Sequence, residues 1–260
     1  MREGYKKLRL VLLVFIALYI VNLVVPLIGP VSHTQRLWFG TSVTIGLLSL
    51  LTLFKEGWPE KPSVFIGAFL AILAGIIRPF TGVVTFLAFL ASMRVMEKAD
   101  DRIALLKRPY SASIFLGAGL GIVLGFINLL LAGMPLKFAP SFYAFVVSLN
   151  PGISEEIIYR LFMYAFSIYL LGGRIRTRKE GLWVYVLMIV PHVLLHFPDS
   201  YFVNGTLHLD LETLLFGPVI LGLLFGLPMT MAMLRRDLVS AMMIHTLVDF
   251  IRFVFVGLPF

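Results

Sequence analysis

Long apolar stretches recur along almost the whole of this 260-residue chain, and short segments rich in charged residues separate them. An α-helix needs about 20 mainly apolar residues to cross a bilayer, and helices satisfy their own backbone hydrogen bonds in hydrocarbon. The candidate spans are Leu8–Ile28, Leu37–Phe54, Ser63–Ile77, Phe80–Met96, Ser111–Leu131, Ile153–Leu171, Leu182–Phe197, Thr213–Leu234 and Leu238–Val256. We therefore predict an all-α, polytopic transmembrane bundle of about eight or nine spanning helices.

The composition excludes several other classes of protein. Hydrophobic residues make up 59% of the chain and charged residues only 14%, whereas a soluble domain of this length carries far more charge. The net charge of +8 comes from basic residues beside the apolar stretches, where they act as topology signals and attract anionic lipids. We therefore expect membrane lipids as partners and no nucleic acid. Because cysteine is absent, disulfides, thiolate metal ligands and a cysteine nucleophile are all excluded.

The distribution of lysine and arginine predicts the orientation of the chain. If Ser63–Met96 crosses the membrane twice, with a turn at Arg78-Pro79, one side collects the basic residues of the N-terminus and of segments 55–61, 94–108, 174–179 and 235–236. A single crossing there would place strongly basic loops on opposite sides. Since cytoplasmic loops carry the excess of Lys and Arg, we predict two crossings and a cytoplasmic N-terminus. We expect an integral, multi-pass protein of the cell membrane.

Two adjacent carboxylates and an arginine interrupt one apolar stretch, at Glu155, Glu156 and Arg160. Glu156 and Arg160 are four residues apart with the acid first, so they share a helix face and form an ion pair. One arginine cannot cheaply neutralise two buried carboxylates, so Glu155 needs another cation, a proton, water or a metal. Because Pro151 disfavours helical geometry before it, segment 140–150 is either a helical extension kinked at Pro151 or a partly re-entrant piece packed against protein. In both cases we expect the regular helix to begin at the glutamates, with Ser154 as its cap.

The remaining apolar stretches supply His192 and His196 on one segment and His245 and Asp249 on another. A lone histidine on an apolar helix is commonly a hydrogen-bonded packing residue. Here several polar groups on separate helices require mutual solvation, so we expect them to meet Glu155 in one polar cavity inside the membrane.

These residues resemble the motifs of the type II CAAX prenyl endopeptidases and their bacteriocin-processing relatives, the CPBP or Abi family. Glu155-Glu156-Ile-Ile-Tyr-Arg160 matches its Glu-Glu-x-x-x-Arg helix, His196 with Phe197-Pro198 matches its aromatic-x-x-x-His motif, and His245-Thr-Leu-Val-Asp249 matches its terminal His-x-x-x-Asn. The order and spacing fit from about Ser111 to Val256. The resemblance implies N-terminal transmembrane helices in residues 1–110 and a catalytic helical core in 111–260, within one integrated membrane domain.

Three positions depart from the family pattern. His192 stands where the family has an aromatic residue, Leu161 where glycine is common, and Asp249 where the family has asparagine. His192 also offers a second choice of motif histidine, but the Phe-Pro-Asp that follows His196 favours His196.

The resemblance implies an intramembrane endopeptidase that uses a glutamate-activated water, like enzymes that remove the C-terminal tripeptide from prenylated CAAX substrates. The substrate would be a peptide or a lipidated C-terminal peptide that enters from the bilayer. Peptide hydrolysis needs a base, a group that orients the water and a donor to the oxyanion. We assign these roles to Glu155, His196 and His245, and Asp249 occupies the place of a second donor. The supporting residues are Glu156, Arg160 and His192. We expect neither a cofactor nor a metal.

Two alternatives stay open. A zinc-dependent membrane protease could use Glu155, His196 and His245 as ligands with His192 in addition, although the sequence lacks the glutamate of a His-Glu-x-x-His motif and the family is regarded as metal-independent. A non-catalytic protein of the same fold could use the polar cluster as a scaffold or as an ion or proton path. No Gly-x-Ser-x-Gly elbow supports a serine nucleophile.

Overall fold

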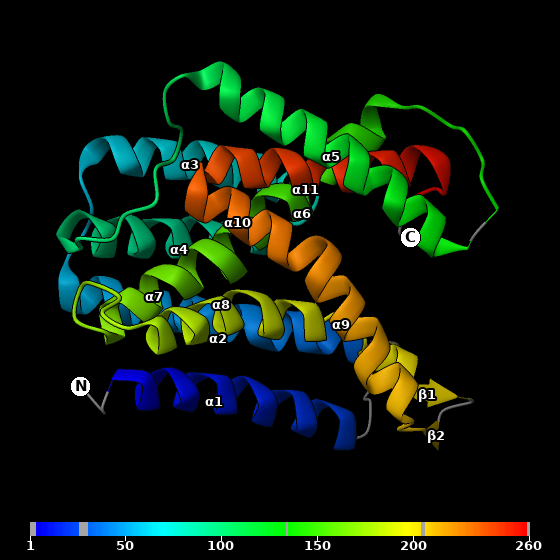
Figure 1. The fold of residues 1–260 in the computed structure, drawn as a ribbon, viewed down its shortest axis with the longest axis horizontal. Helices are drawn as coiled ribbons and strands as arrows, with labels where there is room; N and C mark the ends of the chain where they lie inside the picture. Colours follow the sequence, from blue (N-terminus) through cyan, green and yellow to red (C-terminus); the bar gives the residue numbers. More distant parts are fainter. Residues whose placement is uncertain (1–3, 26–30, 134, 204–205, 259–260) are drawn as a thin grey trace.

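The computed structural model describes residues 4–25, 31–133, 135–203 and 206–258, and almost all regular structure in these ranges is helical (Figure 1). The N-terminal helices are α1 (Gly4–Val24), α2 (His33–Glu56), α3 (Lys61–Gly75), α4 (Pro79–Lys98) and α5 (Tyr110–Ala132). The next are α6 (Phe142–Glu155), the π-helical turn η1 (Glu156–Leu161), α7 (Phe162–Leu170) and α8 (Arg178–Leu194). The last are η3 (Glu212–Phe216), α9 (Gly217–Leu221), η4 (Gly222–Gly226), α10 (Leu227–Arg235) and α11 (Leu238–Phe255). A short 3₁₀ turn, η2 (Pro198–Tyr201), precedes an antiparallel pair of two-residue strands, β1 (Phe202–Val203) and β2 (Thr206–Leu207).

The all-α architecture predicted from the apolar stretches is confirmed. Among the described residues, six helices are long and apolar enough to cross a membrane: Gly4–Val24, His33–Glu56, Pro79–Lys98, Tyr110–Leu131, Thr213–Arg235 and Leu238–Phe255. The figure of eight or nine spanning helices remains a prediction. The first helix ends at Val24, and residues 26–28 of the expected first span lie outside the described ranges.

The ambiguous region Ser63–Met96 forms two helices, α3 and α4, which pack side by side and are joined by a turn at Arg78. Figure 1 shows that the connections before α3, before α5, before α8 and before α11 lie at the same end of the bundle as the N-terminus. Two contacts tie these loops together: Lys98 Nζ lies 2.8 Å from Glu56 Oε2, and the Ile175 N–H donates to Asp101 Oδ2 at 2.7 Å. Because Ser63–Met96 forms two helices, the basic loops lie at one end of the bundle, which we call the basic end.

The pairing of α5 with α11 depends on three small residues. Glycines recur at four-residue intervals along α5, at Gly117, Gly121 and Gly125. A Cβ added at Gly121 would lie 2.9 Å from Leu247 Cβ, and the other two glycines meet α11 side chains equally closely. Small residues with this spacing let helices in membranes approach closely enough for backbone and side chains to interlock.

The helix that carries the glutamate pair starts earlier than predicted. The chain is helical without interruption from Phe142 through Pro151 to Leu170. Ser141 is the N-cap, because its hydroxyl accepts a hydrogen bond from the Ala144 N–H at 3.0 Å. Ser154 is not a cap, since its hydroxyl donates to the Asn150 carbonyl at 2.6 Å inside the helix. In an apolar environment the backbone must bond to itself, which favours continuing the helix through a proline over opening it to a loop.

Asp237 fixes the start of α11 to the loop before α5. Its fully buried carboxylate accepts hydrogen bonds from the N–H and the hydroxyl of Ser240, at 2.8 and 2.7 Å. It also accepts from the Ser113 hydroxyl at 2.5 Å and from the Lys107 N–H at 3.0 Å. Burial alone would raise the pKa of the Asp237 carboxyl, but these hydrogen bonds outweigh that effect and hold the pKa below its usual value.

We expect Asp237→Asn to reduce stability at pH 7 by about 1 to 3 kcal/mol, as for hydrogen bonds to a charged group. The folded-state pKa is depressed, so the carboxylate contributes stability above the unfolded pKa of about 3.9 and loses it as the pH falls through the folded value. The difference between wild type and variant in thermal unfolding of the detergent-solubilised protein should therefore shrink below about pH 4. A difference that stays constant from pH 7 to pH 3 would contradict this.

A second prediction concerns orientation. Lys107, at the basic end, and Lys137, at the opposite end, are both exposed, and the chain has no natural cysteine. If the basic end is cytoplasmic, a membrane-impermeant thiol reagent applied to intact cells should label Lys137→Cys and leave Lys107→Cys unlabelled. Permeabilised cells, in which both variants should react, are the control. The reverse pattern in intact cells would overturn the predicted cytoplasmic N-terminus.

Candidate active site

The glutamate pair lies near the middle of the continuous helix formed by α6, η1 and α7. Glu155 is 13 residues beyond Phe142, which corresponds to about 20 Å along the helix axis. One turn earlier, α6 crosses α11 at Gly152, where any added Cβ would overlap Thr246. This close approach needs glycine and brings the glutamates next to the histidine-bearing face of α11.

Glu156 is the fully buried link between η1 and α11. Its Oε1 contacts Arg160 Nη1, which confirms the ion pair predicted from the four-residue spacing. The same oxygen lies 2.7 Å from His245 Nδ1. Arg160 is 1% exposed, so all three groups are removed from water together. This arrangement fixes the His245 ring so that its Nε2 points away from Glu156.

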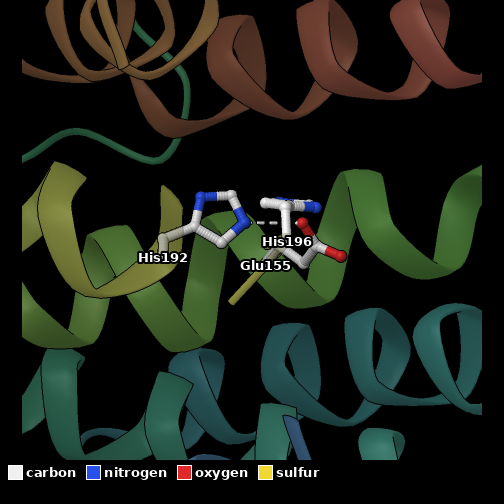
Figure 2. A group of neighbouring side chains, drawn as sticks. All are labelled: Glu155, His192 and His196. Atoms are coloured by element: carbon white, nitrogen blue, oxygen red, sulfur yellow. Dashed lines mark hydrogen bonds and ion pairs between the residues drawn. The ribbon is translucent and has the colours of Figure 1, made fainter. Parts of the chain in front are cut away.

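Glu155 faces a different set of partners, as the rotation between adjacent helical residues requires. Its Oε2 lies 2.7 Å from His192 Nε2 and 3.5 Å from His245 Nε2. Figure 2 shows the His192 imidazole directed at the Glu155 carboxylate, with the His196 ring beside it. The described residues thus include three helical segments whose polar groups meet at Glu155.

The two candidate motif histidines take different positions. His192 is buried in the last turn of α8, whereas α8 ends at Leu194 and His196 lies exposed in the following turn. The direct hydrogen bond to Glu155 comes from His192 and not from His196, the residue that the motif favours. His196 instead lines the open cavity.

Aromatic and hydroxyl groups of α2 and η1 hold these histidines in place. The buried Tyr159 ring stacks on His192 with centroids 5.3 Å apart, and the Tyr159 hydroxyl lies 3.1 Å from both Thr41 and Ser42. Trp38 meets His192 and His196 edge-on, with centroids at 5.8 and 5.4 Å. An α2 contribution to the site was not predicted, because an aromatic and two hydroxyl residues in an apolar stretch are ordinary packing residues in a sequence.

Asp249 lies one turn beyond His245 on α11, and its Oδ2 is 3.5 Å from His245 Nε2. The Nε2 atom therefore has carboxylate oxygens of Glu155 and Asp249 at the same distance. The structure brings together all the predicted site residues, namely Glu155, Glu156, Arg160, His192, His196, His245 and Asp249.

A cavity of about 530 Å³ is lined by Glu155 and by residues at the start of α2, in the turn between α3 and α4 and in the last turn of α11. These three parts of the backbone lie at the end of the bundle opposite the basic end (Figure 1). Its lining includes Glu155, Tyr159, His196 and Asp249, together with Gln35, Arg78 and Arg252. A smaller cavity of about 90 Å³ is lined by Arg160, His192, His245 and Asn128 among others, and it shares His196, Asp249 and Arg252 with the larger one. The polar residues therefore enclose a space that is large enough for a short peptide segment and for water.

Three of these side chains are placed so that they could hold a metal ion. One ligand atom each from Glu155, His192 and His196 lies within 4.8 Å of the other two. Two imidazoles and a carboxylate are an accepted ligand set for zinc. The set differs from the one expected from the sequence, because His192 takes the place of His245.

The turn η1 is the main feature of the site that has no sequence signal. Single π-helical turns inside α-helices occur frequently at functional sites. Here the turn begins between the two glutamates, at Glu156, and ends one residue after Arg160. Glu156 and Arg160 thus lie inside the π-helical turn, whereas Glu155 is the last residue of the α-helix before it.

Comparison with known proteins finds one matching family model. Residues 137–251 match the family model described as Rce1-like, type II CAAX prenyl endopeptidase Rce1-like. The matched region contains α6, η1, α7, α8 and most of α11, and with them all three motifs. No curated protein and no solved structure matches the chain. The family and the six candidate spans together support an integral membrane peptidase of the CAAX-protease type. The resemblance to the type II CAAX prenyl endopeptidases is thus confirmed over residues 137–251.

Proposed function

We propose that this protein is an intramembrane endopeptidase in which Glu155 activates a water molecule for attack on a peptide carbonyl. The observation that carries the proposal is the position of the Glu155 carboxylate. It lines a 530 Å³ cavity inside an apolar bundle and has two imidazole nitrogens within 3.5 Å. A carboxylate in such a place is costly to maintain, and membrane proteins retain such groups for function.

In the proposed reaction, Glu155 takes a proton from water as the oxygen bonds to the carbonyl carbon. The proton then passes to the leaving amine as the peptide bond breaks, which leaves a carboxylic acid and an amine. His196 faces the same cavity and orients the water. His192 holds the Glu155 carboxylate through its Nε2.

His245 is the proposed donor to the oxyanion. Its Nδ1 faces the Glu156 carboxylate, so Nε2 donates a hydrogen bond only when the ring is cationic. Asp249, 3.5 Å from Nε2, then acts as a counter-charge to that cation rather than as a neutral donor. The substrate is a peptide or lipidated C-terminal peptide that reaches the cavity from the bilayer.

A zinc-dependent peptidase is the second candidate, because Glu155, His192 and His196 form a possible three-ligand group. In that mechanism Glu155 would be a ligand and the metal would lower the pKa of the bound water. The two candidates differ in whether purified active protein contains a stoichiometric metal and loses activity with a chelator.

Replacing Glu155 tests the proposal directly. Glu155→Gln should lower turnover at least ~100-fold, the loss expected when a general base is removed, while the fold is retained. Hydrolysis of prenylated peptides by purified protein in lipid nanodiscs measures this, and proteomic comparison of membranes reports new peptide termini. Glu60→Gln, which alters an exposed glutamate at the basic end, is the matched control and should have wild-type activity.

Near-normal hydrolysis by Glu155→Gln would remove Glu155 from the role of base. Absence of cleavage by wild type in both assays would favour a non-catalytic scaffold or an ion path. Stoichiometric zinc together with inactivation by a chelator would replace the metal-independent mechanism by the zinc-dependent one.

His192 provides a further test, because it distinguishes a positioning role from packing. His192→Phe keeps an aromatic ring against Tyr159 but removes the nitrogen that bonds Glu155, so kcat should fall by about 10- to 100-fold with little change in KM. His192→Gln keeps an N–H donor and should retain more activity than His192→Phe. Equal loss in both variants, accompanied by a lower Tm, would indicate that His192 serves packing alone.

A further inference from the structure

The smaller of the two cavities, which we call the small cavity, adjoins the proposed catalytic cluster. Its volume is about 90 Å³, and its walls include residues of α5, α8, η4 and α11. His196, Asp249 and Arg252 line both this space and the large cavity, so the two spaces adjoin at these side chains. At about 30 Å³ for each water molecule in the liquid, the small cavity has room for roughly three.

Two buried nitrogen atoms of its lining residues have no protein partner. Arg160 and His192 line the small cavity and are 1% and 4% exposed. Within the described residues, neither Arg160 Nε nor His192 Nδ1 has a hydrogen-bond partner. Buried polar atoms are normally hydrogen-bonded, because an unpaired one keeps the full penalty of its removal from water. The two atoms therefore indicate a polar ligand in the small cavity.

The hydrogen-bonding character of the lining residues selects water as that ligand. His192 Nε2 lies 2.7 Å from the Glu155 carboxylate, so in the neutral ring it carries the proton and Nδ1 is an acceptor. Arg160 Nε can only donate. A halide ion accepts hydrogen bonds but cannot donate one, and a metal cation is repelled by the guanidinium, whereas water donates to one atom and accepts from the other. Asn128, the amide side chain of α5 that lines the same cavity, offers water both a donor and an acceptor.

The small cavity also borders the groups of the proposed reaction. His192 and His245 line it, and the Nε2 atom of each lies within 3.5 Å of Glu155 Oε2. Glu155 itself lines the large cavity, where the proposed peptide substrate lies. A bound peptide displaces water from the space that it occupies, while each cleavage consumes one water molecule, whose oxygen ends in the new carboxylic acid. Water held outside the peptide's cavity stays available to Glu155.

We propose that the small cavity is an internal water site that supplies the hydrolytic water to Glu155 while the peptide occupies the large cavity. The water site deepens the proposed peptidase function, and its role as a supply rests on that function. Water passes to Glu155 beside His196 and Asp249, which border both spaces. Asn128 is a positioning residue in this site, because it holds the water and not the substrate.

Buried methionines provide a test of the water site that does not need activity. Met229 lines the small cavity and is 2% exposed, whereas Met163 and Met188 are 1% and 0% exposed and line neither cavity. X-ray pulses generate hydroxyl radicals from water, so a buried methionine is oxidised quickly only where water lies beside it. In nanodiscs we expect Met229 to be oxidised at least ~5-fold faster than Met163 and Met188, as for a side chain next to ordered water. Asn128→Leu, which replaces the amide by an apolar side chain of similar size, should lower the Met229 rate at least about twofold.

The same variants test the supply of water to the reaction. Asn128→Leu should lower kcat by about 3- to 10-fold, the range expected for one lost hydrogen bond, with KM unchanged because the peptide does not occupy the small cavity. Asn128→Ser keeps a hydroxyl for water and should retain at least about half of the wild-type kcat. Ile127→Leu is the matched control, since Ile127 is partly buried beside Asn128 on α5 and lines neither cavity. It should keep the wild-type kcat and the wild-type oxidation of Met229.

Oxidation of Met229 at the rate of Met163 and Met188 would mean a dry cavity and overturn the water site. An unchanged kcat in Asn128→Leu, or an equal loss of kcat in the leucine and serine variants with a lower Tm, would overturn the supply role. If the wild type cleaves no peptide, the peptidase function fails and the supply role with it, whereas the oxidation rates still decide whether the small cavity holds water.

Discussion

The buried carboxylate of Glu156 is the contact on which the arrangement of the site depends. It joins Arg160 on its own helix to His245 on α11, and none of the three groups is more than 7% exposed. Breaking a buried pair by removing one partner typically costs about 3 to 5 kcal/mol, because an uncompensated charge is left in the interior. The network therefore strongly disfavours any relative shift of α6 and α11. Gly152 permits the close crossing of these helices, and Glu156 keeps it in register.

The two adjacent glutamates consequently differ in function although they share a sequence environment. Glu156 is enclosed and paired with a permanent cation, so it has no access to substrate. Glu155 is turned toward α8 and the cavity, where its partners are imidazoles, which can gain or lose a proton. The chemistry proposed for Glu155 thus depends on Glu156 supplying the fixed structure. One carboxylate could not provide both rigidity and reactivity.

Much of the fold and part of the site followed from the sequence. Hydropathy predicted the helices, and the distribution of basic residues predicted that α3 and α4 are separate. Both patterns depend on how residues interact with lipid and water, so they can be read without knowing the tertiary contacts. The ion pair Glu156–Arg160 followed from helical spacing. The start of the long helix did not, since Ser141 and not Ser154 is its cap. Neither did the choice between His192 and His196 as the partner of Glu155, which depends on where α8 ends. Trp38 and Tyr159 were missed because a polar function of aromatic residues in an apolar stretch becomes visible only through their neighbours.

The two departures from the family motifs, at His192 and Asp249, affect the same group of contacts around Glu155 and His245. Asp249 adds a carboxylate next to His245 where the family has a neutral amide, and His192 adds a nitrogen next to Glu155 where the family has an aromatic ring. Both atoms lie within 3.5 Å of groups that are themselves joined, Glu155 and His245. An extra acceptor in a buried cluster is costly unless a donor accompanies it. His192 Nε2 lies 2.7 Å from Glu155 Oε2, so the two changes add a nitrogen beside the proposed base and a carboxylate beside His245, and both enlarge the network around Glu155. Within the described residues, Glu156 Oε2, Arg160 Nε and His192 Nδ1 are buried without a hydrogen-bond partner, so the enlarged network leaves three of its own polar atoms unpaired.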